Sequence, residues 1–180
     1  MIVSGPRLKR RDRKERIMMK FMVKQKILSL SDSFVIHDED NRPVYRVAGK
    51  LFSFGDQLTI YDMNNQEQIY IEQKLFKLLP EYHFFENGRQ VAVVKKEFTF
   101  FKPKFNVESE SGRYTIEGNL LGYNFRVLKD GIVVAQVDKA FFAFRDTYSV
   151  EVSPGEDQRF LLALCIIIDQ TLHDRNHNNH

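Results

Sequence analysis

Residues 91–100 read VAVVKKEFTF, and this segment decides the fold because the chain contains its pattern four times. Each copy has an alternating apolar strand, a lysine and then an aromatic cluster. The other copies are residues 44–54 (VYRVAGKLFSF), 69–76 (IYIEQKLF) and 133–142 (VVAQVDKAFF). A recurring pattern of this length marks a repeated supersecondary unit, and alternation with short turns makes that unit a strand pair. The repetition predicts an antiparallel β protein.

The alternation predicts about twelve strands, with turn residues between them. Asn87-Gly88 and Asp130-Gly131 tolerate the positive φ that tight hairpins need. Period-two alternation gives each strand one packed face, and closure into a barrel removes exposed edges. We expect strands at about 21–28, 33–38, 44–52, 57–62, 68–76, 81–86, 91–101, 105–109, 113–119, 123–129, 133–141 and 146–152.

The last element breaks the pattern. Residues 160–168 (FLLALCIII) are apolar on every side, so a helix there must be buried all round or lie in lipid. The run is too short to span a bilayer. Residues 153–156 (SPGE) have the form of a capping box and predict the start of the helix. The predicted fold is therefore mainly β, a closed antiparallel barrel around a central apolar C-terminal helix.

Length and charge indicate one domain with two tails. The chain has 180 residues and a net charge of +3, of which residues 1–20 carry +6 and the rest −3. We expect a basic, disordered tail at 1–20, a single domain at 21–174 and a polar tail at 175–180. The sole cysteine, Cys165, excludes a disulfide framework and a cysteine zinc site. No signal peptide or spanning segment is expected, which favours a cytoplasmic protein, soluble or peripheral at the membrane.

Several separated segments resemble the LURP-one-related family, and its bacterial branch most. They are residues 24–36, the four lysine-plus-aromatic repeats, residues 98–105 (FTFFKPKF) and residues 161–174, so that the likeness covers about residues 21–174. The resemblance implies the tubby C-terminal fold, a twelve-stranded barrel around a central helix. Tubby proteins bind phosphoinositides through basic residues on the barrel. No segment here aligns with that site, so none of its residues is carried over.

Two groups of basic residues are candidates for binding anionic lipid. The first is the tail, which is alternatively a solvated start of the chain. The second is a set of lysines at equivalent places in the repeats, which are alternatively solvated strand ends. The candidates are Arg7, Lys9, Arg10, Arg11, Arg13, Lys14, Arg16 and Lys20 in the tail, and Lys50, Lys74, Lys96 and Lys139 in the repeats.

The sequence contains no catalytic or metal-site signature. There is no Gly-rich phosphate loop, GxSxG elbow or HExxH motif. Asp56 and Asp146 follow matching aromatic clusters and are read as turn-capping residues rather than an acid/base pair. His173 and His177 have a metal-compatible spacing only if the helix continues through a polar, Asn-rich end. We expect no cofactor, no metal and no enzymatic activity.

The leading hypothesis is a non-enzymatic binding or tethering module at anionic phospholipid membranes. The alternative is a protein-interaction scaffold that uses exposed Phe clusters. Nucleic-acid binding by the tail ranks third because the domain is acidic, and an enzyme on an outer cleft ranks last. The sequence leaves the ligand and the oligomeric state open.

Overall fold

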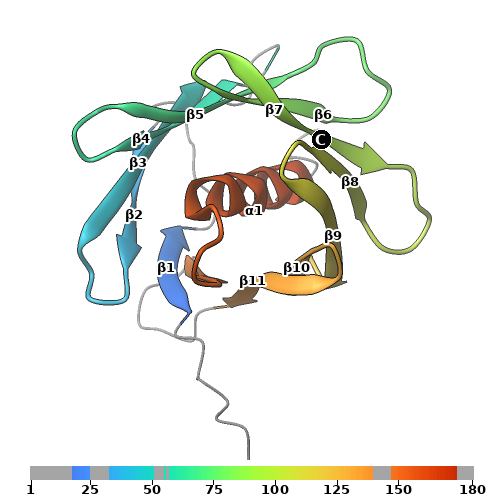
Figure 1. Cartoon of the computed structure of the whole chain (residues 1–180). Coiled ribbons are helices and arrows are strands. Elements are labelled where there is room, and N and C mark those ends of the chain that lie inside the picture. The colour runs from blue at the N-terminus through green and yellow to red at the C-terminus, as the bar shows by residue number, and fades with distance from the viewer. Residues whose placement is uncertain (1–17, 25–32, 51–54, 56, 140–146, 174–180) are drawn as a thin grey trace, which may run out of the picture.

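The computed structural model describes residues 18–24, 33–50, 55, 57–139 and 147–173. These residues form a closed antiparallel barrel in which each strand pairs with its sequence neighbours and β1 pairs with β12 (Figure 1). The strands are β1 Met19–Lys24, β2 Ser33–Asp38, β3 Pro43–Lys50, β4 Gln57–Asp62, β5 Glu67–Gln73, β6 Glu81–Glu86, β7 Arg89–Glu97, β8 Lys104–Ser109, β9 Gly112–Asn119, β10 Asn124–Lys129, β11 Ile132–Lys139 and β12 Thr147–Val152. The predicted fold class is confirmed.

Among the described residues there is one helix, α1 (Gln158–His173), which crosses the middle of the ring of strands in Figure 1. Every residue from Phe160 to Ile168 is buried. The strands meet the helix with their inward faces, because alternate residues of a strand point to opposite sides. Phe84 of β6 and Tyr114 of β9 lie with ring centroids 5.7 Å and 5.1 Å from that of Phe160. The predicted buried central helix is therefore confirmed.

The helix begins later than the sequence predicts. The predicted capping box at residues 153–156 is wrong. Ser153 is buried, and its N–H donates to the Val134 carbonyl at 2.9 Å. Ser153 thus still belongs to the β11–β12 ladder. The chain then needs a turn, with Gly155 at a φ of 83°, before it can enter the barrel. Asp157 is the cap instead, and its Oδ1 accepts from the backbone N–H groups of Arg159 (3.0 Å) and Phe160 (3.2 Å).

Replacing Asp157 by alanine is expected to lower the free energy of unfolding by about 1 kcal/mol, the usual effect of removing an N-cap. The change removes both capping bonds and the Asp157–Arg159 ion pair of 2.8 Å. Asp157→Asn keeps the capping oxygen and should recover most of the loss. Equilibrium urea unfolding of the three proteins measures this. Equal losses for the two variants would show that the carboxylate charge matters rather than the cap.

Cys165 lies fully buried in the middle of α1, and this burial raises the pKa of its thiol well above the ordinary value. A buried thiol is neutral and inaccessible, so it reacts only when the protein opens. We expect a thiol reagent such as dithionitrobenzoate to label the native protein at least 100-fold more slowly than the urea-unfolded chain. Fast labelling of the native protein would contradict the central position of the helix.

Two strands end earlier than predicted. β5 ends at Gln73 and β7 at Glu97, so residues 74–76 and 98–101 lie outside the sheet. Phe76 has a φ of 60°, which a continuing strand does not allow. The aromatic clusters at residues 74–76 and 98–101, which the sequence places at strand ends, therefore lie in loops. Within the described residues, no helix is long and apolar enough to cross a membrane.

Candidate functional site

Two loops lie side by side at one end of the barrel. The first joins β5 to β6 (residues 74–80) and the second joins β7 to β8 (residues 98–103). The pairing of β6 with β7 brings them together, and the Lys96 N–H donates to the Pro80 carbonyl at 2.9 Å. Tyr123, next to the β9–β10 turn, bonds Asp169 near the C-terminus of α1. This end of the barrel is therefore the one toward which the helix C-terminus points.

The two loops carry apolar side chains into solvent. We call this set the aromatic rim: Leu75, Phe76, Leu78, Phe98, Phe100 and Phe101. Phe76, Leu78 and Phe101 are 95%, 99% and 97% exposed. Single exposed apolar residues are ordinary on protein surfaces, but a cluster of this kind marks an interaction surface. Phe98 and Phe100 stack edge to face with ring centroids 5.2 Å apart, so part of the rim is arranged by its own contacts.

Lysines surround the aromatic rim. Lys77 lies 3.6 Å from Glu81, and Lys74 contacts Glu72. Lys102 and Lys104 are exposed and have no ion-pair partner among the described residues. Within the loops themselves, residues 74–80 and 98–103 contain Lys74, Lys77 and Lys102 and no acidic residue. The rim is therefore apolar, and beside it Lys102 and Lys104 are exposed cations without an ion-pair partner among the described residues.

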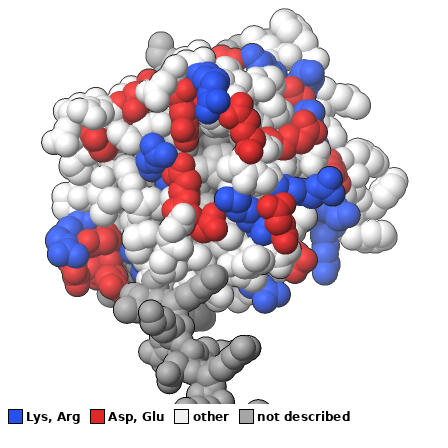
Figure 2. Space-filling view, viewed as in Figure 1, with Lys and Arg blue, Asp and Glu red and all other residues white. Residues whose placement is uncertain are grey.

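The opposite end of the barrel has a different character. Its turns hold Asp38, Glu39, Asp40, Asp62, Glu110, Asp130, Glu156 and Asp157. Basic residues interleave with these acids, and Figure 2 shows the two kinds of charge mixed on one face of the molecule. Arg42 pairs with Asp38 at 2.8 Å, Lys129 with Glu156 at 3.2 Å and Arg89 with Glu110 at 3.1 Å. The barrel is thus polarised, with an acidic, internally paired end and an apolar, basic end.

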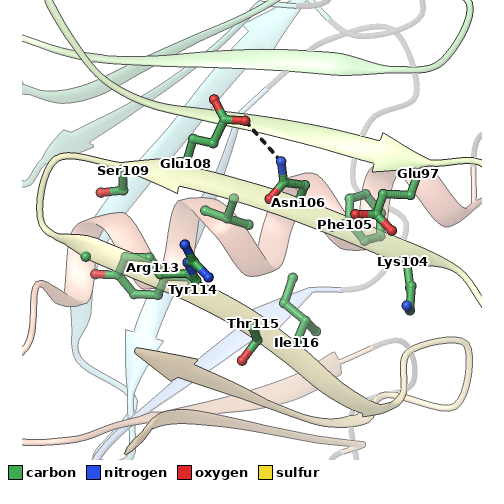
Figure 3. Close-up of a pocket in the computed structure, with 12 residues that line it drawn as sticks. Glu97, Lys104, Phe105, Asn106, Glu108, Ser109, Arg113, Tyr114, Thr115 and Ile116 are labelled. Atoms are coloured by element: carbon green, nitrogen blue, oxygen red, sulfur yellow. Dashed lines mark hydrogen bonds between the residues drawn. The ribbon is translucent and has the colours of Figure 1, made fainter. Parts of the chain in front are cut away.

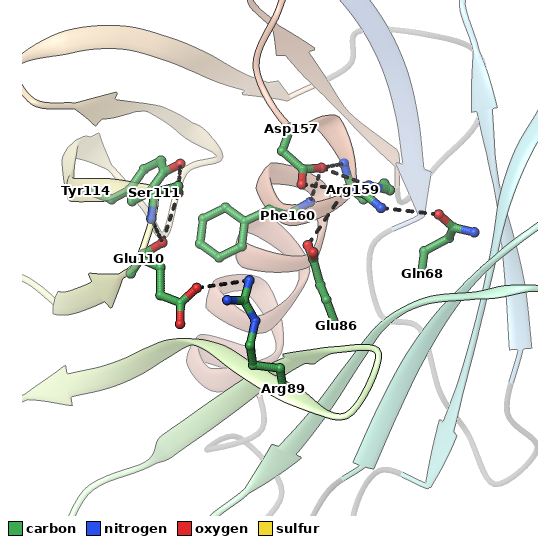
Figure 4. A network of polar contacts seen from close by, with 10 residues as sticks. Gln68, Glu86, Arg89, Glu110, Ser111, Tyr114, Asp157, Arg159 and Phe160 are labelled. Carbon is green, nitrogen blue, oxygen red and sulfur yellow. Dashed lines mark hydrogen bonds and ion pairs between the residues drawn. The ribbon is translucent and has the colours of Figure 1, made fainter.

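The polar network at the acidic end fixes the helix rather than forming a binding site (Figure 4). Arg159 contacts Asp157 at 2.8 Å, Glu86 at 3.7 Å and the side chain of Gln68 at 3.4 Å. Its partner carboxylates hold the pKa of Arg159 above its ordinary value, the hydrogen bond to Asp157 being the largest cause. Because Gln68 belongs to β5 and Glu86 to β6, the contacts tie the first turn of α1 to the barrel wall.

The structure places the predicted basic residues as follows. The tail candidates from Arg7 to Arg16 lie outside the described residues. Lys20 pairs with Glu151 at 3.0 Å, and its strand begins at the acidic end. The repeat lysines do share one end of the barrel, because β3, β5, β7 and β11 run in the same direction. That is the end of the aromatic rim. The side chain of Lys50 lies outside the described residues, Lys96 has a partner, and Lys139 is exposed.

The rim was only partly predictable. The lysine-plus-aromatic repeats gave the signal for Phe76, Phe98 and Phe100, but nothing in the repeats singles out Lys77, Lys102 or Lys104. Phe52, Phe54, Phe141, Phe142 and Phe144, which continue the same repeats, lie outside the described residues.

The structure places the remaining candidate residues as follows. No three His, Cys, Asp or Glu side chains there could hold a metal ion. Asp56, Asp146, His177 and the side chain of His173 lie outside it. His83 contacts Glu81 at 2.9 Å and Gln90 at 2.7 Å, and the hydrogen bond with His83 is the largest cause that lowers the pKa of Glu81. The side chains of Glu81 and His83 lie on the outward face of β6, where they contact each other and Gln90 of the neighbouring strand β7.

Inside the barrel, polar groups gather near the end of α1. The Tyr123 hydroxyl donates to Asp169, a partner that the sequence did not predict. The Thr171 hydroxyl donates to the Ile167 carbonyl at 2.6 Å and lies 3.2 Å from the Tyr82 hydroxyl. Tyr148 is fully buried, and this burial raises the pKa of its phenol well above the ordinary value.

Comparisons with known proteins agree with this architecture. The LURP-one-related family matches residues 19–169. The protein YxjI of Bacillus subtilis (strain 168) is 33% identical over 157 residues, which covers 87% of this chain and 96% of YxjI. A crystal structure of an Arabidopsis thaliana protein superposes with a TM-score of 0.63 and 18% identity, over 88% of this chain and 93% of that one, and shows the same fold. By its sequence match and its barrel, the chain belongs to the LURP-one-related family.

Proposed function

We propose that this protein is a non-enzymatic tethering module that attaches to anionic phospholipid membranes through the aromatic rim. The observation that carries the proposal is the polarity of the barrel. Fully exposed Phe76, Leu78 and Phe101 share one end with Lys102 and Lys104, and the turns at the other end are rich in acids, among them Asp38, Asp40 and Asp157. An anionic surface attracts the first end and repels the second. The charges would therefore both orient the barrel and keep it at the membrane. The protein would then be cytoplasmic and peripheral.

The chemistry of the rim suits the membrane interface. Aromatic rings that leave water gain roughly 1.5–3 kcal/mol each when fully buried, and part of this when they enter the headgroup region. Each lysine near an anionic surface adds about 1 kcal/mol, which salt reduces. The basic residues from Arg7 to Arg16 would add attraction of the same electrostatic kind.

Vesicle co-sedimentation tests the proposal. The full-length protein and a chain that begins at Met18 are compared on neutral phosphatidylcholine vesicles and on vesicles that contain phosphatidylserine, at two salt concentrations. We expect both proteins to bind the anionic vesicles, more tightly at low salt. Binding by the full-length protein alone would assign the attraction to the tail. If neither protein binds at low salt, the proposal is wrong.

The second candidate is a protein-interaction scaffold that uses the same rim. It is favoured by one observation, the exposure of Phe98, Phe100 and Phe101 in the β7–β8 loop, since buried rings would have removed its basis. A protein partner would bury the same rings without any dependence on lipid. The vesicle experiment separates the candidates, because a scaffold would not distinguish anionic from neutral vesicles.

A further inference from the structure

The barrel has a seam between β8 and β9. The two strands pair at Ser109–Gly112, Glu108–Arg113 and Val107–Tyr114, next to their hairpin turn, and the pairing ends there. Both strands continue: β8 still pairs with β7 as far as Lys104, and β9 still pairs with β10 as far as Asn119. Figure 3 shows the two strands diverging from the turn. A groove of about 660 Å³ occupies the space between them.

β9 stays close to β10 beyond the point where it stops pairing with β8. Gly118 has a φ of 124°, which side-chain-bearing residues rarely adopt. A Cβ at Gly118 would meet the Asn124 carbonyl oxygen at 2.6 Å, so β9 lies very close to β10 at this point. β9 thus remains paired with β10 as far as Asn119, whereas its pairing with β8 ends at Tyr114.

Backbone groups in the seam have no strand partner. In an antiparallel ladder, residues whose N–H and C=O point to one neighbouring strand alternate with those that point to the other. The Glu110 N–H donates to Val91 and the Asp130 N–H to Arg113, which fixes the alternation in both strands. Phe105 and Ile116 therefore direct their backbone groups into the groove, beyond the last β8–β9 pair, Val107–Tyr114. An unpaired strand edge of this kind is a template for another extended chain.

The side chains of β8 and β9 alternate between the inside and the outside of the barrel. Phe105, Val107 and Tyr114 are buried and face the helix, and Ile116 is half-buried on the same side. The outward side chains are exposed: Lys104, Asn106, Glu108, Arg113, Thr115 and Glu117. A chain lying in the groove would therefore meet an apolar floor on one side and solvent on the other.

The outer margin of the seam has a net positive character. Two of its three acids are already paired, Glu108 with Lys95 at 3.5 Å and Glu117 with Arg126 at 4.0 Å. Lys104 and Arg113 have no carboxylate within ion-pair distance among the described residues. Glu97, opposite Lys104 in the β7–β8 register, is the remaining acid of the lining. Two cations against one unpaired acid favour an acidic occupant.

We propose that the β8–β9 seam binds an extended segment of a partner protein, which adds to the barrel as a strand. The segment has apolar side chains at alternate positions, toward the helix, and acidic side chains between them, toward Lys104 and Arg113. Main-chain bonds give affinity in strand addition and alternate side chains give specificity. The seam adjoins the aromatic rim at Lys104, whereas Arg113 and the backbone edges at Phe105 and Ile116 lie apart from the rim. Peptide binding in the seam does not require a membrane.

A peptide fits the seam better than a lipid tail does. An acyl chain could cover Phe105 and Ile116, but it offers no donor or acceptor to their backbone groups, which would then be buried without partners. An extended chain offers both donors and acceptors to these backbone groups. The open part of β8, from Lys104 to Asn106, is about 10 Å long at the usual rise per residue, enough for three to four residues.

The test starts from a phage-displayed library of random twelve-residue peptides, selected on the full-length protein. The peptide selected most often is synthesised, and its affinity is measured for the native protein and two variants. Ile116→Pro removes the N–H that points into the seam and touches no β9–β10 bond, since proline is tolerated on a free edge. The exposed pair Lys104→Glu and Arg113→Glu reverses the charge of the margin without disturbing the core. Arg42→Glu with Arg46→Glu is the control, a reversal of two basic side chains that lie on β3 and the β2–β3 hairpin, outside the seam.

We expect selected sequences that alternate apolar and acidic residues, and at least tenfold weaker binding to both seam variants than to the control. Hydrogen exchange should show that the peptide protects the Phe105 and Ile116 amides, which exchange freely beforehand. The proposal is overturned if selection yields no alternating peptide. It is overturned equally if both seam variants bind as the control does, or if anionic vesicles protect these amides and the peptide does not.

Discussion

Replacing Leu164 by alanine is expected to lower the free energy of unfolding by about 2–5 kcal/mol, the range for leucine truncations in protein cores. Leu164 lies in the middle of α1 with no exposed surface, and the strands surround it. The truncation loses the transfer free energy of the buried methyl groups and leaves a cavity that a closed barrel cannot collapse to fill. Because whole domains are stable by only about 5–15 kcal/mol, this single change removes a large part of the margin.

Leu78→Ala is the matched control, since it makes the same chemical change at a side chain that is 99% exposed. A surface change of this kind should alter stability by about 0.5 kcal/mol or less. Equilibrium urea unfolding of both variants gives the comparison, and the difference between the midpoints is the quantity of interest. Similar losses for the two variants would mean that the helix is not the centre of the core.

The combined variant Phe76→Ser, Phe100→Ser and Phe101→Ser is expected to bind anionic vesicles about 100-fold more weakly than the native protein. If each ring gains about 1 kcal/mol from partial immersion, the three together give about 3 kcal/mol, and 1.4 kcal/mol corresponds to a factor of ten. The fold should be unaffected, because the three side chains are 95%, 85% and 97% exposed. Titration of each protein with vesicles that contain phosphatidylserine measures the effect.

The control for this experiment is Met63→Ser with Ile132→Ser. Both side chains are exposed apolar residues, at 48% and 61%, and both lie at turns of the acidic end. The control should bind vesicles as the native protein does. Equal losses in the two variants would indicate a general effect of surface hydrophobicity and would remove the orientation that the proposed function requires.

Strand alternation and turn chemistry were enough to predict the barrel and the helix buried inside it. The alternating residues of the repeats fix which side of each strand is buried, and residues 160–168 have no polar side to expose. These are local properties, and each can be satisfied in only a few ways. The helix start was missed because it depends on a tertiary requirement: Ser153 completes a ladder bond to Val134 before the chain can turn inward, and Asp157 becomes the cap.

The candidate surfaces depended on the tertiary structure in the same way. The sequence places an aromatic cluster after each lysine of the repeats, but it cannot tell whether Phe76 or Phe101 packs or projects, since that depends on the loop ends that β6 and β7 bring together. The seam has no sequence signal at all. Residues 104–109 and 112–119 alternate as paired strands do, yet the pairing of β8 with β9 ends at Val107–Tyr114. The sequence by itself determined the barrel and its buried helix, because burial follows from side-chain periodicity. The tertiary structure alone decided which apolar groups and strand edges stay uncovered, because that depends on how the strands meet in space.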